Sequence, residues 1–79
     1  YEAGMLARSK AGHDKAQMYI IKEVDDTYVY LVDGRIRTLG HPKKKKKKHV
    51  QIVHGIYNMK ELDDAGIRKL IKDWMKEEK

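Results

Sequence analysis

Short runs rich in aromatic and β-branched residues, each ended by a turn signal, fill the first two thirds of the chain. They predict strands over residues 3–10, 17–24 and 27–32, because such side chains suit a pleated, partly buried surface. In residues 17–24 both parities are apolar near the middle, so alternation alone does not choose the face that packs on the core. A β-bulge that changes the parity midway is an alternative.

Asp33 and Gly34 form the dipeptide that most readily supplies the positive φ angles of a two-residue hairpin turn. We expect it to join the third strand to a fourth strand over residues 35–37, with two arginines on one face and Ile36 on the other. A fifth strand is expected over residues 49–53, after a long loop. Five short strands with tight turns indicate a small closed barrel, which would leave no sheet edge exposed.

The last quarter of the chain changes its period and predicts a helix. Apolar side chains recur there at positions i, i+3, i+4, i+7 and i+8, the stripe of an amphipathic helix: Ile67, Leu70, Ile71, Trp74 and Met75. Asp63 or Asp64 is a suitable N-cap, and Asn58 with Glu61 has the spacing of a capping box, which predicts a short preceding turn of helix. We expect the apolar stripe to pack across an open side of the barrel.

The length of 79 residues predicts one folded unit with a modest core: a barrel at residues 1–54, carrying a basic loop at 40–49, and a helical segment at 55–79 packed on it. The chain has no cysteine, which excludes disulfides and thiolate metal sites and favours the cytoplasm. No apolar run approaches the roughly 20 residues of a membrane span, and the N-terminus lacks a secretory pattern.

The net charge of +6 is distributed unevenly along the chain. Residues 1–50 hold twelve Lys and Arg against six Asp and Glu, whereas residues 51–79 hold six of each. The whole positive excess therefore lies in the predicted β part. This asymmetry indicates a polyanion-binding face next to a neutral helix.

Six consecutive lysines, residues 43–48, follow Gly40 and Pro42. Adjacent ammonium groups repel one another, so we expect a solvated, mobile loop unless an anion neutralises it. The arginines and histidines nearby, at positions 35, 37, 41 and 49, favour nucleic-acid binding, since a planar guanidinium fits phosphate oxygens bidentately. A plain solubilising loop is the alternative, as is a nuclear-import signal, because Pro followed by lysines resembles one.

Residues 4–17, GMLARSKAGHDKAQ, followed by MYIIKEV, resemble a KOW motif, in which a Gly-centred loop joins two strands. The later LVDG and RIR, the basic loop and the C-terminal helix are similar to the large-subunit ribosomal proteins named L-fourteen-e and to short bacterial KOW-domain RNA-binding proteins. The resemblance covers nearly the whole chain, and its most specific parts are residues 11–14 and 31–34. Ala16 departs from the motif, which usually has Gly after a basic residue.

This resemblance implies a mainly β fold, a small SH3-like five-stranded barrel with a C-terminal α-helix, and a role in binding ribosomal or other structured RNA. It also implies that the loop around Gly12 contacts RNA, whereas Asp14 suits a turn position, where its side chain bonds nearby backbone amides. Together with the basic loop, this predicts the following RNA-binding residues: Arg8, Lys10, His13, Lys15, Arg35, Arg37, Lys43, Lys44, Lys45, Lys46, Lys47, Lys48 and His49.

Catalytic, cofactor and metal sites are not expected. His13, His41, His49 and His54 share no spacing typical of zinc ligands, and no cysteine assists them. Ser9 is the only serine, no glycine-rich phosphate loop is present, and adjacent carboxylate pairs suit turns and caps better than a shared substrate. We therefore expect a protein that is not an enzyme.

The tyrosines offer a weaker signal. Tyr19, Tyr28 and Tyr30 could stack on unpaired bases, but packing within strands is the favoured interpretation, because no run of exposed aromatics adjoins the basic loop. Tyr57 and Trp74 are expected to pack where the helix meets the barrel.

We expect a monomeric, cytoplasmic, ribosome-associated RNA-binding protein that engages phosphates and takes its specificity from RNA shape. If about six phosphates are engaged, affinity should fall about a thousandfold between roughly 50 and 200 mM salt. The alternative is an SH3-like protein-interaction module whose basic loop binds an acidic partner, which would need tyrosines clustered on the outer surface. Binding to an anionic membrane is less favoured, because the helix stripe is expected to be used in packing.

Overall fold

The computed structural model describes residues 1–10 and 17–77. In chain order the elements are β1 (Met5–Ser9), β2 (Met18–Val24), β3 (Tyr28–Val32), β4 (Lys43–Lys46), the 3-10 turn η2 (Lys47–His49), β5 (Val50–Ile56), the 3-10 turn η3 (Met59–Glu61) and α1 (Asp64–Glu77). This confirms the predicted fold class, a small mainly β barrel of five strands with a C-terminal helix.

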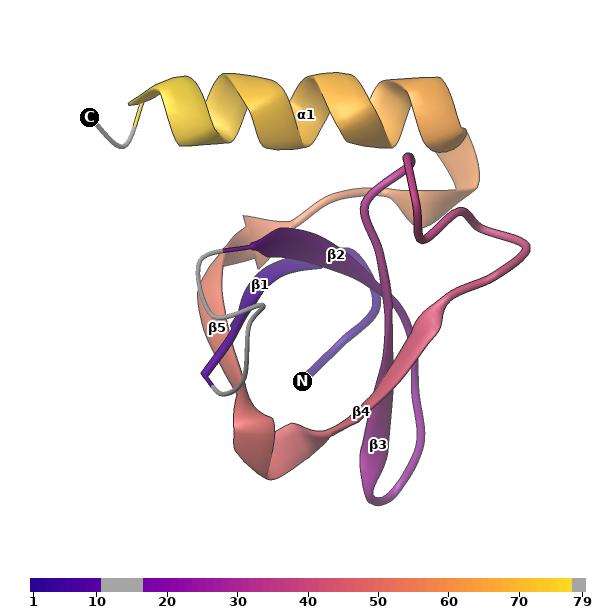
Figure 1. Cartoon of the computed structure of the whole chain (residues 1–79), viewed down its shortest axis with the longest axis vertical. Coiled ribbons are helices and arrows are strands. Elements are labelled where there is room, and N and C mark those ends of the chain that lie inside the picture. Colours follow the sequence, from indigo (N-terminus) through magenta and orange to yellow (C-terminus); the bar gives the residue numbers. More distant parts are fainter. Residues whose placement is uncertain (11–16, 78–79) are drawn as a thin grey trace.

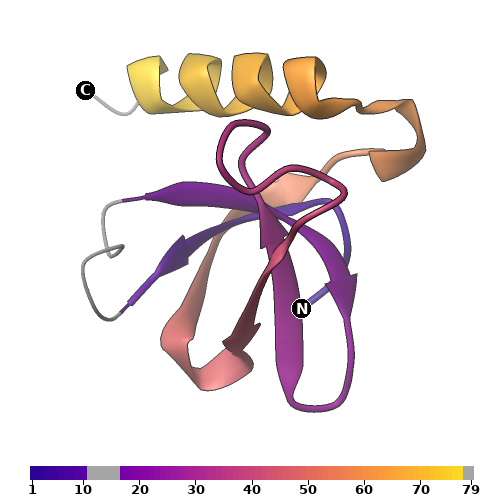
Figure 2. The same cartoon turned by 45° about the vertical axis from the view of Figure 1, so that its right-hand side comes forward.

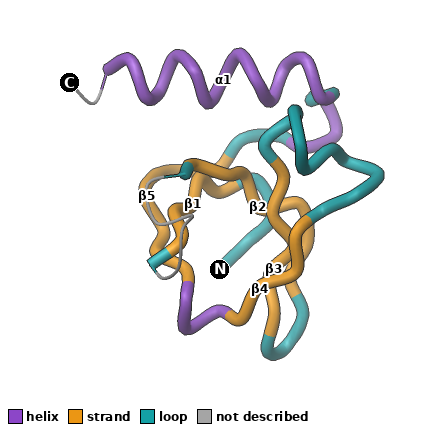
Figure 3. Tube along the Cα trace, viewed as in Figure 1, coloured by secondary structure: helices purple, strands orange, loops and turns teal. Residues whose placement is uncertain are grey.

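The strands form one antiparallel sheet in the order β4-β3-β2-β1-β5, which curls into a half-barrel (Figures 1 and 3). Within the described residues the end strands β4 and β5 do not pair with each other, and η2 connects them. The expectation of a closed barrel is therefore wrong. Among residues 1–10 and 17–77, no further strand pairs with the outer edge of β4 or of β5.

Each face of the sheet has its own apolar cluster, because β2 is apolar at both parities. On one face Leu6 lies opposite Ile20, and this face packs against Ile67 and Ile71 of α1. On the other face Ala7 lies opposite Tyr19, inside the curl of the half-barrel. The helix accordingly lies across the outside of the sheet, at one end of the molecule (Figure 2).

The C-terminal helix begins as its capping residues predict. The Asp63 carboxylate accepts a hydrogen bond from the Gly66 amide at 2.7 Å, which satisfies one of the unpaired N–H groups of the first turn. The Asn58 side chain accepts from the Lys60 amide at 3.0 Å and caps η3. Ile67 and Ile71 are buried, and Leu70 and Trp74 are partly buried against the same core, which confirms these four members of the apolar stripe. Met75, the last predicted member, is exposed instead.

The predicted fourth strand at residues 35–37 is wrong. The Asp33 carboxylate accepts hydrogen bonds from the amides of Arg35 at 2.8 Å and Arg37 at 3.0 Å, and the Arg37 carbonyl accepts from the amides of Asp33 and Gly34. These bonds close a loop in place of a two-residue hairpin, because the Asp side chain competes with strand pairing for the same backbone groups. Gly34 does take the predicted positive φ, +77°.

The fourth strand is formed by the lysines themselves. β4 pairs with β3 so that Lys43 lies opposite Leu31 and Lys46 opposite Tyr28. The predicted mobile loop is therefore an edge strand followed by a 3-10 turn. The physical reason is that β3 would otherwise leave its own N–H and C=O groups unpaired along one edge, and an extended chain sends successive ammonium groups to opposite faces.

The other strand predictions differ from the structure mainly at their ends. The strand predicted over residues 3–10 spans only Met5–Ser9, and the one predicted over residues 49–53 runs as Val50–Ile56. The strands predicted over 17–24 and 27–32 each begin one residue later than expected. In the described part of the chain, no helix has the length and apolar character needed to cross a membrane.

Candidate nucleic-acid interface

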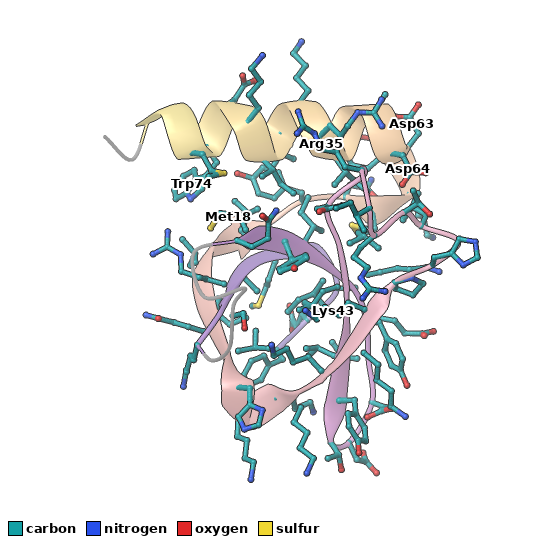
Figure 4. The ribbon with its side chains drawn as sticks, viewed as in Figure 1. Met18, Arg35, Lys43, Asp63, Asp64 and Trp74 are labelled. Carbon is teal, nitrogen blue, oxygen red and sulfur yellow. The ribbon has the colours of Figure 1, made fainter. Side chains whose placement is uncertain are left out.

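The pairing of β4 with β3 sorts the lysines onto two faces. Residues directly opposite each other in an antiparallel pair point to the same side. Lys43 and Lys45 lie opposite Leu31 and Val29, which are buried inside the curl, and both lysines are half-buried. Figure 4 shows Lys43 directed toward the inside of the half-barrel. Lys44 and Lys46 point outward and are exposed.

The pKa of Lys43, one of the two inward-facing lysines, is lower than the usual value for a lysine. Burial, and then the neighbouring charge of Lys45, lower the pKa of the Lys43 ammonium. Among the described residues, no carboxylate forms an ion pair with the lysines that follow, Lys44 to Lys48. Apart from Lys44, whose charge contributes to lowering the pKa of Asp25, these lysines have charge that is available to an incoming anion.

Two tyrosines lie beside the outward lysines. Tyr28 is opposite Lys46 and Tyr30 opposite Lys44, and both rings are half-buried. The Lys44 Nζ lies 4.2 Å from the centroid of the Tyr28 ring, within cation–π distance. In the sequence, no aromatic residue adjoins the lysines. The alternation of residues 28–32 does place Tyr28 and Tyr30 on one face of a strand. The sequence does not show that the lysines form the strand that pairs with it.

The turn before β3 holds these tyrosines in place. The Asp25 carboxylate accepts hydrogen bonds from the amides of Tyr28 at 2.6 Å and Thr27 at 2.9 Å, and from the Tyr30 hydroxyl at 3.1 Å. The two backbone bonds are the main reason that the pKa of Asp25 is lowered, and the bond to Asp25 is the main reason that the pKa of Tyr30 is raised.

The end of the lysine run is also held by the backbone. A hollow of about 350 Å³ lies between the end of the run and the turn before β3, and it is lined by Asp26, Thr27, Lys46, Lys47 and Lys48. The Lys47 amide donates to the Thr27 carbonyl at 3.0 Å, which ties η2 to the turn before β3.

The N-terminal segment lies against the other side of η2. The Tyr1 hydroxyl donates to the carbonyls of Lys47 and Val50, and the Lys10 amide donates to the His49 carbonyl at 2.8 Å. This bond places the Lys10 backbone next to the end of the lysine run. We use the name lysine face for the five residues Lys10, Lys44, Lys46, Lys47 and Lys48.

Other predicted site residues lie elsewhere. Arg8 is half-buried on the helix-packed side of the sheet, where its Nη2 contacts the Met18 sulfur at 3.6 Å. Arg35 lies against α1, at the opposite end of the molecule from η2 (Figure 4). The structure thus does not bring Arg8 and Arg35 together with the lysine face.

Arg37 lies near the Tyr19 phenol. Arg37 is half-buried, close enough to Tyr19 for its charge to oppose the rise that burial and then Asp33 cause in the pKa of that phenol. His13 and Lys15 lie outside the described residues. Within residues 1–10 and 17–77, no three His, Asp or Glu side chains gather as a metal-binding group.

Comparison with known proteins does not indicate a family for this chain. No family model matches the chain, and no curated protein matches it. The resemblance to KOW-domain proteins therefore rests on the motifs in the sequence, and RNA binding remains a prediction.

Proposed function

We propose that this protein binds RNA through phosphate contacts made by the lysine face. The observation that carries the proposal is the arrangement of Lys44, Lys46 and Lys48, which are exposed on a backbone held in place by β3 and by the turn at Thr27. Lysines that share no ion pair with the described carboxylates keep their charge for an external polyanion. Binding then gains from release of the counterions that the phosphates hold.

Tyr28 adds a contact to unpaired bases. Its ring is covered by the Lys44 ammonium in the free protein. When Lys44 moves to a phosphate, the face of the ring becomes available for stacking, which is worth about 1–3 kcal/mol per base. Lysines are point charges and read little sequence, so the preferred target is a structured RNA with unpaired nucleotides, such as ribosomal RNA in the large subunit.

The test is a salt titration of a fluorescently labelled RNA hairpin with a single-stranded loop. Changing Lys44, Lys46 and Lys48 to Ser should weaken binding about a hundredfold at about 0.1 M salt and lower the log–log salt slope by about two, because three phosphate contacts are lost. The matched control changes Lys22, Lys60 and Lys69 to Ser, which removes the same charge from exposed positions in β2, η3 and α1. Equal losses in the two triple variants would refute a localised RNA site.

A second candidate is a protein-interaction module at the same face, favoured by the two outward-facing tyrosines. Tyr19, the third tyrosine of that hypothesis, is only 4% exposed, so it offers no ring to a peptide groove. A short proline-rich acidic peptide that displaces the RNA hairpin at equal concentration would favour this second function.

A further inference from the structure

A second basic site lies at the other end of the molecule from the lysine face. The loop at residues 33–37 and the exposed side of α1 enclose a cleft of about 360 Å³, a size within the range of small ligand sites. We call it the arginine cleft and define it by six of its lining residues: Asp33, Arg35, Arg68, Ile71, Lys72 and Met75. These residues are far apart in the sequence and come together only when α1 packs on the sheet.

The walls of the arginine cleft are held in place without a ligand. The Arg68 Nη1 donates to the Gly34 carbonyl at 2.6 Å, which joins the helix to the loop. A Cβ atom at Gly34 would collide with the Asp64 carbonyl and crowd the Arg68 side chain, so the loop lies as close to α1 as a backbone allows. Asp64 also accepts from the Leu39 amide at 2.8 Å. A preorganised cleft of this kind loses little conformational entropy when it binds.

The chemistry of the cleft combines cations with apolar surface. Arg35, Arg68 and Lys72 outnumber the one carboxylate, Asp33, whose Oδ1 already accepts two backbone amides. Ile71 is 6% exposed at the bottom of the cleft and Met75 is 44% exposed, so Met75 supplies most of the exposed apolar surface of this floor. Ile36, next to Arg35 at the tip of the loop, is 84% exposed.

This combination suits a protein partner better than a phosphate backbone. Arg and Met are enriched at protein interfaces, and an exposed Met adapts to the shape of an inserted side chain. A phosphodiester chain has no apolar group for the floor formed by Ile71 and Met75. We infer that the arginine cleft binds an acidic segment of a partner protein, with an aliphatic side chain on Ile71 and Met75 and carboxylates on Arg35 and Lys72. This site is independent of the RNA-binding proposal.

The probe is a short synthetic peptide with one leucine flanked on both sides by glutamates, added to the full ¹⁵N-labelled chain. The expected shifts are confined to the amides of the loop at 33–37 and of α1 near Lys72 and Met75. Arg35→Glu and Lys72→Glu should each weaken binding about fivefold or more, since each reverses one rim charge. Lys69→Glu is the matched control, because Lys69 is exposed on the same helix but does not line the cleft.

Two comparison ligands keep the inference falsifiable. A peptide with serine in place of leucine should bind more weakly than the leucine peptide, because nothing then covers the apolar floor. Equal binding of the two peptides would overturn the inference, as would an equal effect of Lys69→Glu and Lys72→Glu. If the RNA hairpin shifts the same amides and competes with the peptide, the cleft belongs to an RNA surface and the inference also fails.

Discussion

The lysine face and the arginine cleft are both basic, but they are built in opposite ways. The lysine face comes from residues that are mostly adjacent in sequence, in the edge strand β4 and the turn η2, and all of them except the half-buried Lys47 are exposed. The arginine cleft comes from two distant segments locked by the bond between Arg68 and Gly34. A row of flexible point charges suits a long polyanion of variable shape, whereas cations around an apolar floor, in a cleft whose backbone walls are joined by Arg68, suit one defined ligand. Positive charge alone thus does not specify the partner.

The largest expected effect is that a substitution at Gly34 abolishes binding at the arginine cleft but not at the lysine face. Gly34→Ala should destabilise the protein by about 2–3 kcal/mol, since it adds a Cβ at a φ of +77° against the Asp64 carbonyl. Peptide binding at the arginine cleft should be lost, while RNA affinity of the folded fraction should be unchanged. Chemical denaturation and the two binding assays measure these effects.

The control for this variant is Gly40→Ala, in the same connection between β3 and β4. A Cβ at Gly40 meets no atom within 4 Å, and its φ is not positive. It should leave both stability and peptide binding as they are. If Gly40→Ala destabilises the chain as much as Gly34→Ala, the loop does not depend on its close approach to α1.

The next effect concerns the lysine face and its tyrosine. Tyr28→Ala should lower affinity for the RNA hairpin about fivefold or more by removing a stacking surface of at least 1 kcal/mol. Tyr28→Phe should keep nearly all of the affinity, because the ring that faces Lys44 is preserved. Fluorescence anisotropy measures both. An equal loss in the two variants would mean that the hydroxyl, not the ring, contributes to binding.

A related effect concerns the edge that β4 leaves open. Lysines along an edge strand also hinder pairing with another chain, so charge at Lys44 and Lys46 protects against aggregation whether or not RNA binds. Changing both residues to Thr should raise aggregation on mild heating, measured by light scattering. Changing Lys60 and Lys69 to Thr should not. No difference between the two pairs would argue that the edge needs no such protection.

The smallest effect is a dependence on pH at the turn beside the lysine face. The pKa of Asp25 is below its usual value of 3.8, so its ionised form stabilises the native state above that value. This contribution is lost as the pH falls through the lowered pKa. The melting temperature of Asp25→Ala should therefore be lower than that of the parent protein at neutral pH and should depend less on acidification. Asp26→Ala, next to it in the turn, is the control and should keep the melting temperature of the parent at neutral pH, because the amides of Thr27 and Tyr28 bond to Asp25.

Local sequence signals predicted those parts of the fold that depend on neighbouring residues. The strands at residues 18–24 and 28–32, a cap at Asn58 and at Asp63 or Asp64, and the positive φ of Gly34 are all predictable from local sequence. The Asp33-Gly34 signal predicts a hairpin and a strand at residues 35–37, but the Asp33 carboxylate binds the amides of Arg35 and Arg37 and prevents strand pairing there. The lysines gave no strand signal, since lysine is depleted in strands and a run of like charge normally indicates a loop.

Spacing and composition alone predict an amphipathic C-terminal helix, a β-rich first part and an excess of positive charge, because these signals act over a few residues. Three other features depend on the folded chain: β4 is made of lysines, Lys44 and Lys46 point outward beside Tyr28, and Arg35 joins Arg68 and Lys72 instead of the lysine face. The reason is that the edge of β3, which pairs with the lysines, and the surface of α1, against which Arg35 lies, exist only in the folded chain. Both contacts join residues that are distant in sequence.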